Sequence, residues 1–135
     1  MTIAQVSAQY GLSQDTLRYY ERIGLIPRVG RGKDGKRDYT PEDCKWVEFA
    51  KCMRGSGLSI EALTEYVSLF QKGEGTVAAR KEILVEQRRQ LAARMEAMQA
   101  TLNRLDGKIA RYEERVLKAE QNLIVPQEAQ DTAPL

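Results

Sequence analysis

The segment TLRYYERIGLI, residues 16–26, decides the fold of this chain. It places Tyr19 and Tyr20 side by side, with Arg18 before them and Arg22 after them. Adjacent residues of a helix point to different faces, so one tyrosine can pack in a core while the other points outward with the arginines. Tyrosine hydroxyls and arginine guanidinium groups are standard contacts to nucleic-acid phosphates. The pattern therefore predicts a helix with one packed face and one phosphate-binding face.

A short helix is expected directly before this segment. Thr2 and Gln5 fit a capping box, and Gly11 ends the helical run that they begin. Ser13 then fits the N-cap of the helix that carries Leu17. Two short helices that are joined by a glycine-containing turn are typical of a helix-turn-helix motif.

Residues 27–40, PRVGRGKDGKRDYT, are rich in glycine and charge and are called the wing below. Asp34-Gly35 is a strong signal for a two-residue hairpin turn, which predicts short strands around residues 28–29 and 37–39. Seven Lys or Arg and two Asp or Glu lie between Arg18 and Arg37, seven minus two giving +5, in a chain whose formal net charge is +2. A basic hairpin beside a recognition helix can bind the DNA backbone or the minor groove.

Two longer helices are expected to complete a DNA-binding domain of residues 1–75. Thr40 and Pro41 fit the N-cap and first position of the third helix, which ends near residue 55. Ser59 fits the N-cap of the fourth, and Gly73 and Gly75 end it.

Residues 76–124 carry a different period. Apolar residues recur every seven positions in two series, which is the seam of a coiled coil. The chain offers no other helix to cover this seam, so a second subunit is expected and the protein is predicted to be a homodimer. Residues 125–135 are expected to form a disordered tail. The predicted dimer interface contains Leu84, Leu91, Met95, Met98, Leu102, Leu105, Ile109, Tyr112 and Val116.

The composition argues against an enzyme. The chain has no histidine, and it contains no nucleophile–base pair, P-loop or metal cluster, so no cofactor is expected. Cys44 and Cys52 are eight residues apart, about 12 Å along a helix, which is too far to share a metal. Neither a signal peptide nor a membrane-spanning stretch is evident, so the predicted location is the cytoplasm, without membrane contact.

The motifs resemble the MerR family of transcription regulators. The resemblance is carried by TLRYYERIGLI, by the R-x-Y of residues 37–39 and by GLSIEAL at residues 57–63. It implies a mainly α protein, with a winged helix-turn-helix head followed by a long antiparallel coiled-coil dimerisation helix. It also implies binding to a palindromic promoter as a dimer and activation by DNA distortion, which acts on RNA polymerase indirectly.

Both the basic pattern and the resemblance indicate which residues face DNA. The resemblance assigns residues of the second helix and of the R-x-Y motif, and the local charge adds the remaining arginines and lysines. The predicted DNA-binding residues are Ser13, Gln14, Thr16, Arg18, Tyr19, Arg22, Arg28, Lys33, Lys36, Arg37 and Tyr39.

A narrower resemblance concerns the signal that the protein detects. WVEFAKCMRGSGLSIEAL at residues 46–63 and ARKEILVEQR at residues 79–88 resemble NmlR/AdhR-like regulators, which respond to reactive aldehydes and thiol-modifying stress. In that group one cysteine in the third helix is the proposed sensor, and it matches Cys52. Cys44 departs from the single-cysteine pattern.

Two alternatives stay open at this stage. Cysteine in an apolar helix is commonly inert packing, so Cys52 could be structural in a MerR-type regulator with another effector. The chain could also be an adaptor whose coiled coil is the functional part. The basic wing separates these classes, because only a regulator should bind promoter DNA with steep salt dependence.

Overall fold

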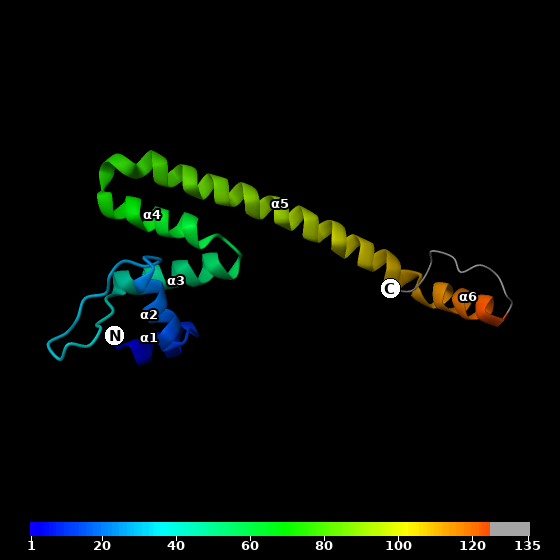
Figure 1. The fold of residues 1–135 in the computed structure, drawn as a ribbon, viewed down its shortest axis with the longest axis horizontal. Coiled ribbons are helices and arrows are strands. Elements are labelled where there is room, and N and C mark those ends of the chain that lie inside the picture. The colour runs from blue at the N-terminus through cyan, green and yellow to red at the C-terminus, as the bar shows by residue number, and fades with distance from the viewer. Residues whose placement is uncertain (125–135) are drawn as a thin grey trace. The chain divides into compact units, whose positions relative to one another are not determined.

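The computed structural model describes residues 1–124, and the expected tail lies outside them. The chain is helical, as predicted, and forms two compact units, a head unit of Met1–Ala92 and a helical unit that begins at Ala93. The elements are α1 (Ile3–Tyr10), α2 (Gln14–Arg22), α3 (Pro41–Gly55), α4 (Ile60–Lys72), the 3-10 turn η1 (Glu74–Thr76), α5 (Val77–Ala110) and α6 (Tyr112–Ile124) (Figure 1).

Side-chain caps begin the four helices of the head, as the sequence predicts. Thr2 and Thr40 each form a capping box with the residue three positions later, so two backbone N–H groups at each helix start are satisfied. Ser13 and Ser59 each accept a hydrogen bond from the backbone N–H three residues further on. These caps place the starts of α1 to α4 by local chemistry alone.

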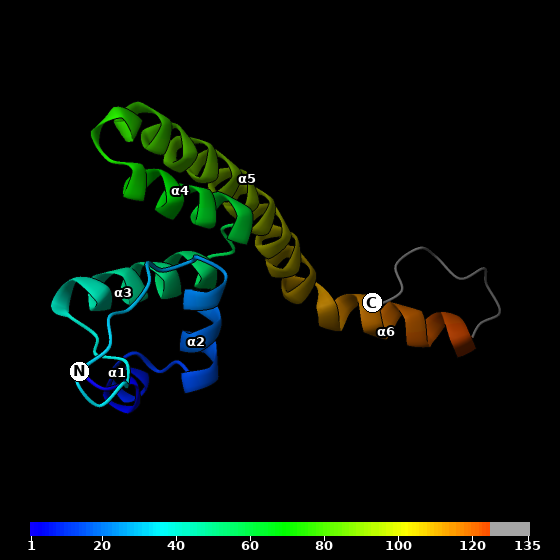
Figure 2. The ribbon, with the colours of Figure 1, turned by 60° about the vertical axis from the view of Figure 1, so that its left-hand side comes forward.

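A single apolar core holds α1, α2, α3, α4 and the base of the wing together. Each large side chain that is fully buried in it contributes about 1.5–3 kcal/mol. Figure 2 shows α2 standing against α3, and α4 running alongside the first part of α5. The buried apolar residues of this core are Val6, Leu17, Leu25, Ile26, Val29, Tyr39, Cys44, Val47, Ala50, Leu58 and Leu63.

The wing forms without the two expected strands. Within residues 1–124 the structure has no regular strand. The two arms of the wing pair through an isolated antiparallel β-bridge between Arg31 and Arg37. The backbone N–H of Gly35 bonds the carbonyl of Gly32 at 3.0 Å, and Gly35 has a φ of 76°. The turn is therefore a three-residue type with glycine in the left-handed region, rather than a two-residue Asp34-Gly35 turn.

The beginning of α5 belongs to the head unit, which extends past the expected boundary at residue 75. Gln87 is buried, and Leu91 packs against the apolar core of its own chain. The seven-residue repeat alone assigned Leu91 to a dimer interface. In the structure Leu91 is half-buried against the head of its own chain, and its place in a dimer interface stays a prediction.

The expected continuous helix of residues 76–124 is interrupted at Arg111, between α5 and α6. The backbone N–H of Arg111 bonds the carbonyl of Lys108, three residues earlier, instead of a carbonyl four residues earlier. Among the helices that the structure describes, none has an apolar stretch long enough to cross a bilayer.

Candidate nucleic-acid interface

The two tyrosines of α2 point to different sides, as the sequence predicts. Tyr20 packs against the core beside fully buried Leu17, whereas Tyr19 is 38% exposed. The guanidinium of Arg22 lies 5.3 Å from the centre of the Tyr19 ring, within the range of a cation–π contact. This contact groups an aromatic hydroxyl and a positive charge on the outer face of α2.

The first turn of α2 adds polar side chains to the same helix. Arg18 Nη1 donates to Asp15 Oδ1 at 3.0 Å, and its Nη2 donates to Gln14 Oε1 at 3.4 Å. The Ser13 hydroxyl donates to Thr16 Oγ1 at 2.8 Å. Exposed pairs of this kind add little stability and leave Arg18 on the solvent side of α2.

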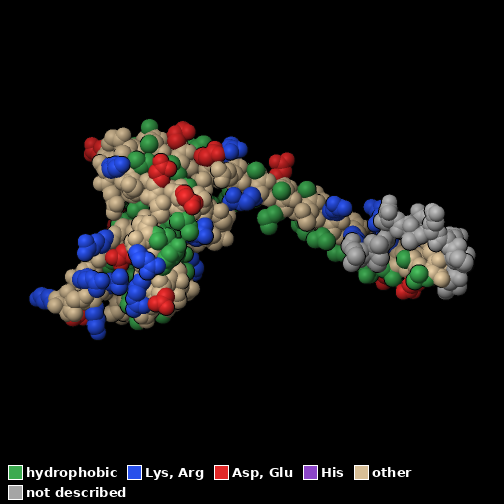
Figure 3. Space-filling view, in the orientation of Figure 1, with side chains coloured by type: hydrophobic (Ala, Val, Ile, Leu, Met, Phe, Trp, Pro, Cys, Tyr) green, Lys and Arg blue, Asp and Glu red, His purple; other side chains and the backbone are tan. Residues whose placement is uncertain are grey.

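The wing carries positive charges that are free of internal ion pairs. Arg28, Lys33 and Lys36 are exposed, and no ion pair involves them in the described part of the chain. Figure 3 shows Lys and Arg side chains gathered on the head unit over α2 and the wing. Such a surface attracts polyanions although the whole chain is nearly neutral.

Arg37 differs from these residues because it is partnered. Its Nε donates to Glu21 Oε1 at 2.7 Å, and the two side chains are 21% and 13% exposed. The pair joins the wing to α2 and lines a surface depression of about 410 Å³ together with Arg18, Arg22 and Arg28. Glu21 was not among the site residues predicted from the sequence. A single acid between Arg18 and Arg22 could have indicated an ion pair with a nearby arginine.

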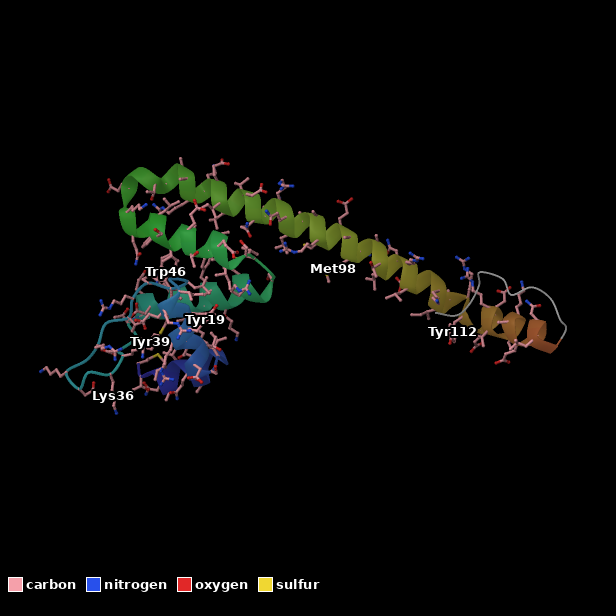
Figure 4. The ribbon with its side chains drawn as sticks, in the orientation of Figure 1. Tyr19, Lys36, Tyr39, Trp46, Met98 and Tyr112 are labelled. Carbon is pink, nitrogen blue, oxygen red and sulfur yellow. The ribbon has the colours of Figure 1, made fainter. Side chains whose placement is uncertain are left out.

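Tyr39 is not a DNA-facing residue in this structure, which corrects the prediction from the R-x-Y motif. Its side chain is 1% exposed, and its hydroxyl has no hydrogen-bond partner among the described residues. Two backbone hydrogen bonds with Met1, each 2.8 Å, hold residue 39 where the wing returns to the head (Figure 4). Burial raises the pKa of the Tyr39 hydroxyl above its usual range.

The two cysteines lie in different environments on α3. Cys44 is buried in the core, with its Sγ 3.9 Å from the Met1 Sδ, whereas Cys52 is exposed near the end of the helix. The exposure of Cys52 does not fit the inert packing role that its apolar neighbours suggested. Within residues 1–124, no group of three or more His, Cys, Asp or Glu side chains is placed to hold a metal.

The helical unit presents an apolar stripe that the described chain leaves uncovered. Figure 3 shows hydrophobic side chains following one side of this unit, and Figure 4 shows Met98 pointing away from α5. Four of the side chains line an open groove of about 600 Å³. The stripe consists of exposed Met95, Met98, Leu102, Leu105, Ile109 and Tyr112, with half-buried Val116 following in α6.

The head therefore has the geometry of a DNA-binding module, with a capped helix-turn-helix, a basic wing and an appended helical unit. Two family models match the chain. Residues 1–69 match the MerR HTH family regulatory protein model, and residues 45–108 match the model described as MerR, DNA binding. The chain belongs to the MerR family. It is a DNA-binding transcription regulator and not an enzyme.

Related sequences carry the same description. The chain is 62% identical over 91 residues to the HTH-type transcriptional regulator AdhR of Bacillus subtilis, an alignment that covers 67% of this chain. The chain spans 65% of the length of that relative. It is also 37% identical over 83 residues to the transcriptional regulator HmrR of Rhizobium leguminosarum, covering 62% of this chain and 64% of HmrR.

Solved structures agree with the fold. A Listeria monocytogenes protein described as a MerR family transcriptional regulator superimposes with a TM-score of 0.82 at 46% identity, over 91% of this chain and 93% of the other. HiNmlR, a MerR family regulator lacking the sensor domain and bound to promoter DNA, gives a TM-score of 0.77 at 27% identity, over 86% and 92% of the chains.

Proposed function

We propose that the protein binds a palindromic promoter as a homodimer joined by an antiparallel coiled coil. It activates transcription by distorting the DNA so that RNA polymerase can engage the promoter, and it responds to reactive aldehydes or other thiol-modifying electrophiles through Cys52. The observation that carries this proposal is the basic face of α2 and the wing, which combines exposed arginines and lysines with an outward tyrosine.

The basic face supports DNA contact from two elements at once. Arg18, Tyr19 and Arg22 lie on α2, the second helix of the helix-turn-helix, and this helix is the one that enters the major groove. Arg28, Lys33 and Lys36 extend the charge along the wing, where they can follow the phosphate backbone.

The apolar stripe supports dimerisation. Leu102 and Leu105 are each about half exposed, and Met98 and Ile109 are each 71% exposed. A contiguous apolar face of this kind is costly in water and marks an interaction surface. Two copies that pair along the stripe would hold two heads, and two heads predict two half-sites in the DNA.

The exposure of Cys52 supports the sensing part of the proposal. An electrophile has to reach the sulfur, and Cys52 is exposed on α3 whereas Cys44 is buried. The match between Cys52 and the single cysteine of NmlR/AdhR-like regulators is the second argument, and the 62% identity to AdhR agrees with it.

Transcription from the promoter next to the protein's own gene tests the proposal. Purified protein and RNA polymerase are assayed with and without formaldehyde, in the wild type, in Cys52→Ser and in Cys44→Ser. We expect induction in the wild type and in Cys44→Ser, and none in Cys52→Ser although that variant still binds the promoter. Full induction of Cys52→Ser would show that another group detects the effector.

A second candidate is a MerR-type regulator in which Cys52 does not sense anything. The burial of Cys44 beside Met1 favours a structural role for Cys44. The same argument does not apply to Cys52, because Cys52 is exposed. The coiled-coil adaptor is disfavoured, because the basic face of α2 and the wing would then have no role.

A further inference from the structure

Glu21 is a carboxylate in the middle of a positively charged surface. It lines the same depression as Arg18, Arg22, Arg28 and Arg37. A negative charge beside DNA repels phosphate, so Glu21 opposes binding by simple electrostatics. A contact of Glu21 that favours DNA binding could offset this repulsion.

Arg37 provides such a contact. The Glu21–Arg37 pair is largely shielded from water, at 13% and 21% exposure, and its 2.7 Å hydrogen bond is charge-assisted. Asp15 offers a contrast on the same helix, because it also pairs with an arginine but is 96% exposed and connects only residues of α2. Glu21 therefore connects α2 to the wing through a residue 16 positions further along the chain, whereas Asp15 stays within α2.

The wing is also attached to the head where it returns, because the Met1 amino group pairs with Asp38 Oδ1 at 3.2 Å and bonds the Tyr39 carbonyl. The Met1–Asp38 pair is more exposed to water than the Glu21–Arg37 pair.

The two arms of the wing are joined by the Arg31–Arg37 bridge, and the carbonyl of Gly30 accepts a hydrogen bond from the N–H of Asp38. Buried Val29 and Tyr39 anchor its base in the core. Arg37 belongs to the bridge, so holding Arg37 holds both arms at the point where the wing leaves the head.

We propose that Glu21 is a positioning residue for DNA binding, because its carboxylate fixes Arg37 and thereby holds the wing beside α2. The inference rests on the proposed function, in which α2 and the wing together contact DNA. Pre-ordering the wing spares the complex the entropy cost of ordering it on binding.

The positioning role and simple repulsion predict opposite results. If Glu21 only repels DNA, both Glu21→Ala and Glu21→Gln should bind promoter DNA more tightly. If Glu21 positions the wing, Glu21→Ala should bind at least about fivefold more weakly, because the wing has to be ordered during binding. Glu21→Gln keeps an oxygen acceptor for the Arg37 Nε–H and should restore wild-type affinity or better.

The experiment measures the dissociation constant for a promoter fragment at several salt concentrations, with Asp15→Ala as the matched control. Asp15→Ala removes the same charge from the same helix and should bind no more weakly than the wild type. Limited trypsin digestion gives an independent readout, since the wing contains exposed Arg31, Lys33 and Lys36. Faster cleavage there in Glu21→Ala, at equal thermal stability, is the expected sign of a released wing.

A double-mutant cycle keeps the proposal testable if Glu21→Ala is unstable. In an Arg37→Ala background the carboxylate has no partner to hold, so adding Glu21→Ala should now strengthen DNA binding. A loss of affinity in both backgrounds, or a gain in both, would overturn the positioning role.

The proposed interface is checked separately by Arg18→Ala. If Arg18→Ala binds DNA as the wild type does, the assignment of α2 is wrong. If Arg18→Ala binds weakly while Glu21→Ala and Asp15→Ala behave alike, the interface stands and only the role of Glu21 fails.

Discussion

The backbone N–H of Ser59 donates a hydrogen bond to Gln87 Oε1 at 3.3 Å, and this bond joins the start of α4 to α5 across 28 residues of sequence. Gln87 is 6% exposed and is a buried polar residue in the described part of the head. The side chain of Ser59 caps α4 at the same place. The bond therefore ties the beginning of the long helix to the DNA-binding head.

Gln87→Ala should destabilise the protein by about 1 kcal/mol, because the Ser59 N–H then loses its acceptor at a partly buried place. Urea unfolding followed by circular dichroism measures this loss. Gln99→Ala is the control, since Gln99 is an exposed glutamine of α5 whose Nε2 donates to Asn103 Oδ1 on the same helix. Equal stability of the two variants would show that the bond to Ser59 contributes nothing.

Tyr39→Phe should change the response of stability to alkaline pH. Burial raises the pKa of Tyr39 in the folded protein, so the unfolded chain ionises first. The stability of the folded protein is therefore unaffected by Tyr39 ionisation below about pH 10. It falls as the pH rises from there through the pKa of Tyr39 in the folded state. Tyr39→Phe should therefore lose less stability than the wild type above about pH 10, which thermal melts at pH 7, 10 and 11 would measure.

The same variant is informative at neutral pH. Because the Tyr39 hydroxyl is buried without a partner in the described chain, its removal should leave stability unchanged or raise it by about 1 kcal/mol. A clear loss of stability at pH 7 would mean that the hydroxyl has a partner in solution.

Arg18→Ala should weaken DNA binding at every sequence tested and lower the slope of log affinity against log salt by about 1, because one phosphate contact is lost. Fluorescence anisotropy with promoter and unrelated DNA measures both quantities. Lys72→Ala removes an exposed charge at the end of α4, outside α2 and the wing, and should bind as the wild type does. A similar loss in both variants would indicate that only total charge matters.

Leu102→Arg should prevent the proposed dimerisation, since it places a charge in the middle of the apolar stripe. Light scattering after size-exclusion chromatography measures the mass directly. Ala100→Arg is the matched control, because residue 100 belongs to neither seven-residue series. A dimer of undiminished stability in Leu102→Arg would show that the stripe is not the interface.

A thiol reagent should distinguish the two cysteines. Native protein should react with a maleimide at Cys52 and not at buried Cys44, giving one label per chain. Mass spectrometry counts the labels, and unfolding in guanidinium should raise the count to two. Rapid labelling of native Cys52→Ser would show that Cys44 becomes accessible in solution.

Local patterns in the sequence determined the helix starts and the apolar repeat. The capping boxes at Thr2 and Thr40 and the caps at Ser13 and Ser59 involve residues only three positions apart, so chain-local geometry is enough to predict them. The opposite orientations of Tyr19 and Tyr20 follow from helical geometry in the same way.

Only the tertiary structure decided which of these residues are exposed to solvent and which are buried or paired. The burial of Tyr39, the packing of Leu91 on the head and the pairing of Glu21 with Arg37 are contacts between segments that are far apart in sequence. A motif or a seven-residue period describes a residue type at a position, but the partner that buries or holds it comes from elsewhere in the chain. The sequence therefore determined the helices and their charged and apolar faces, whereas packing determined which residues of those faces remain exposed.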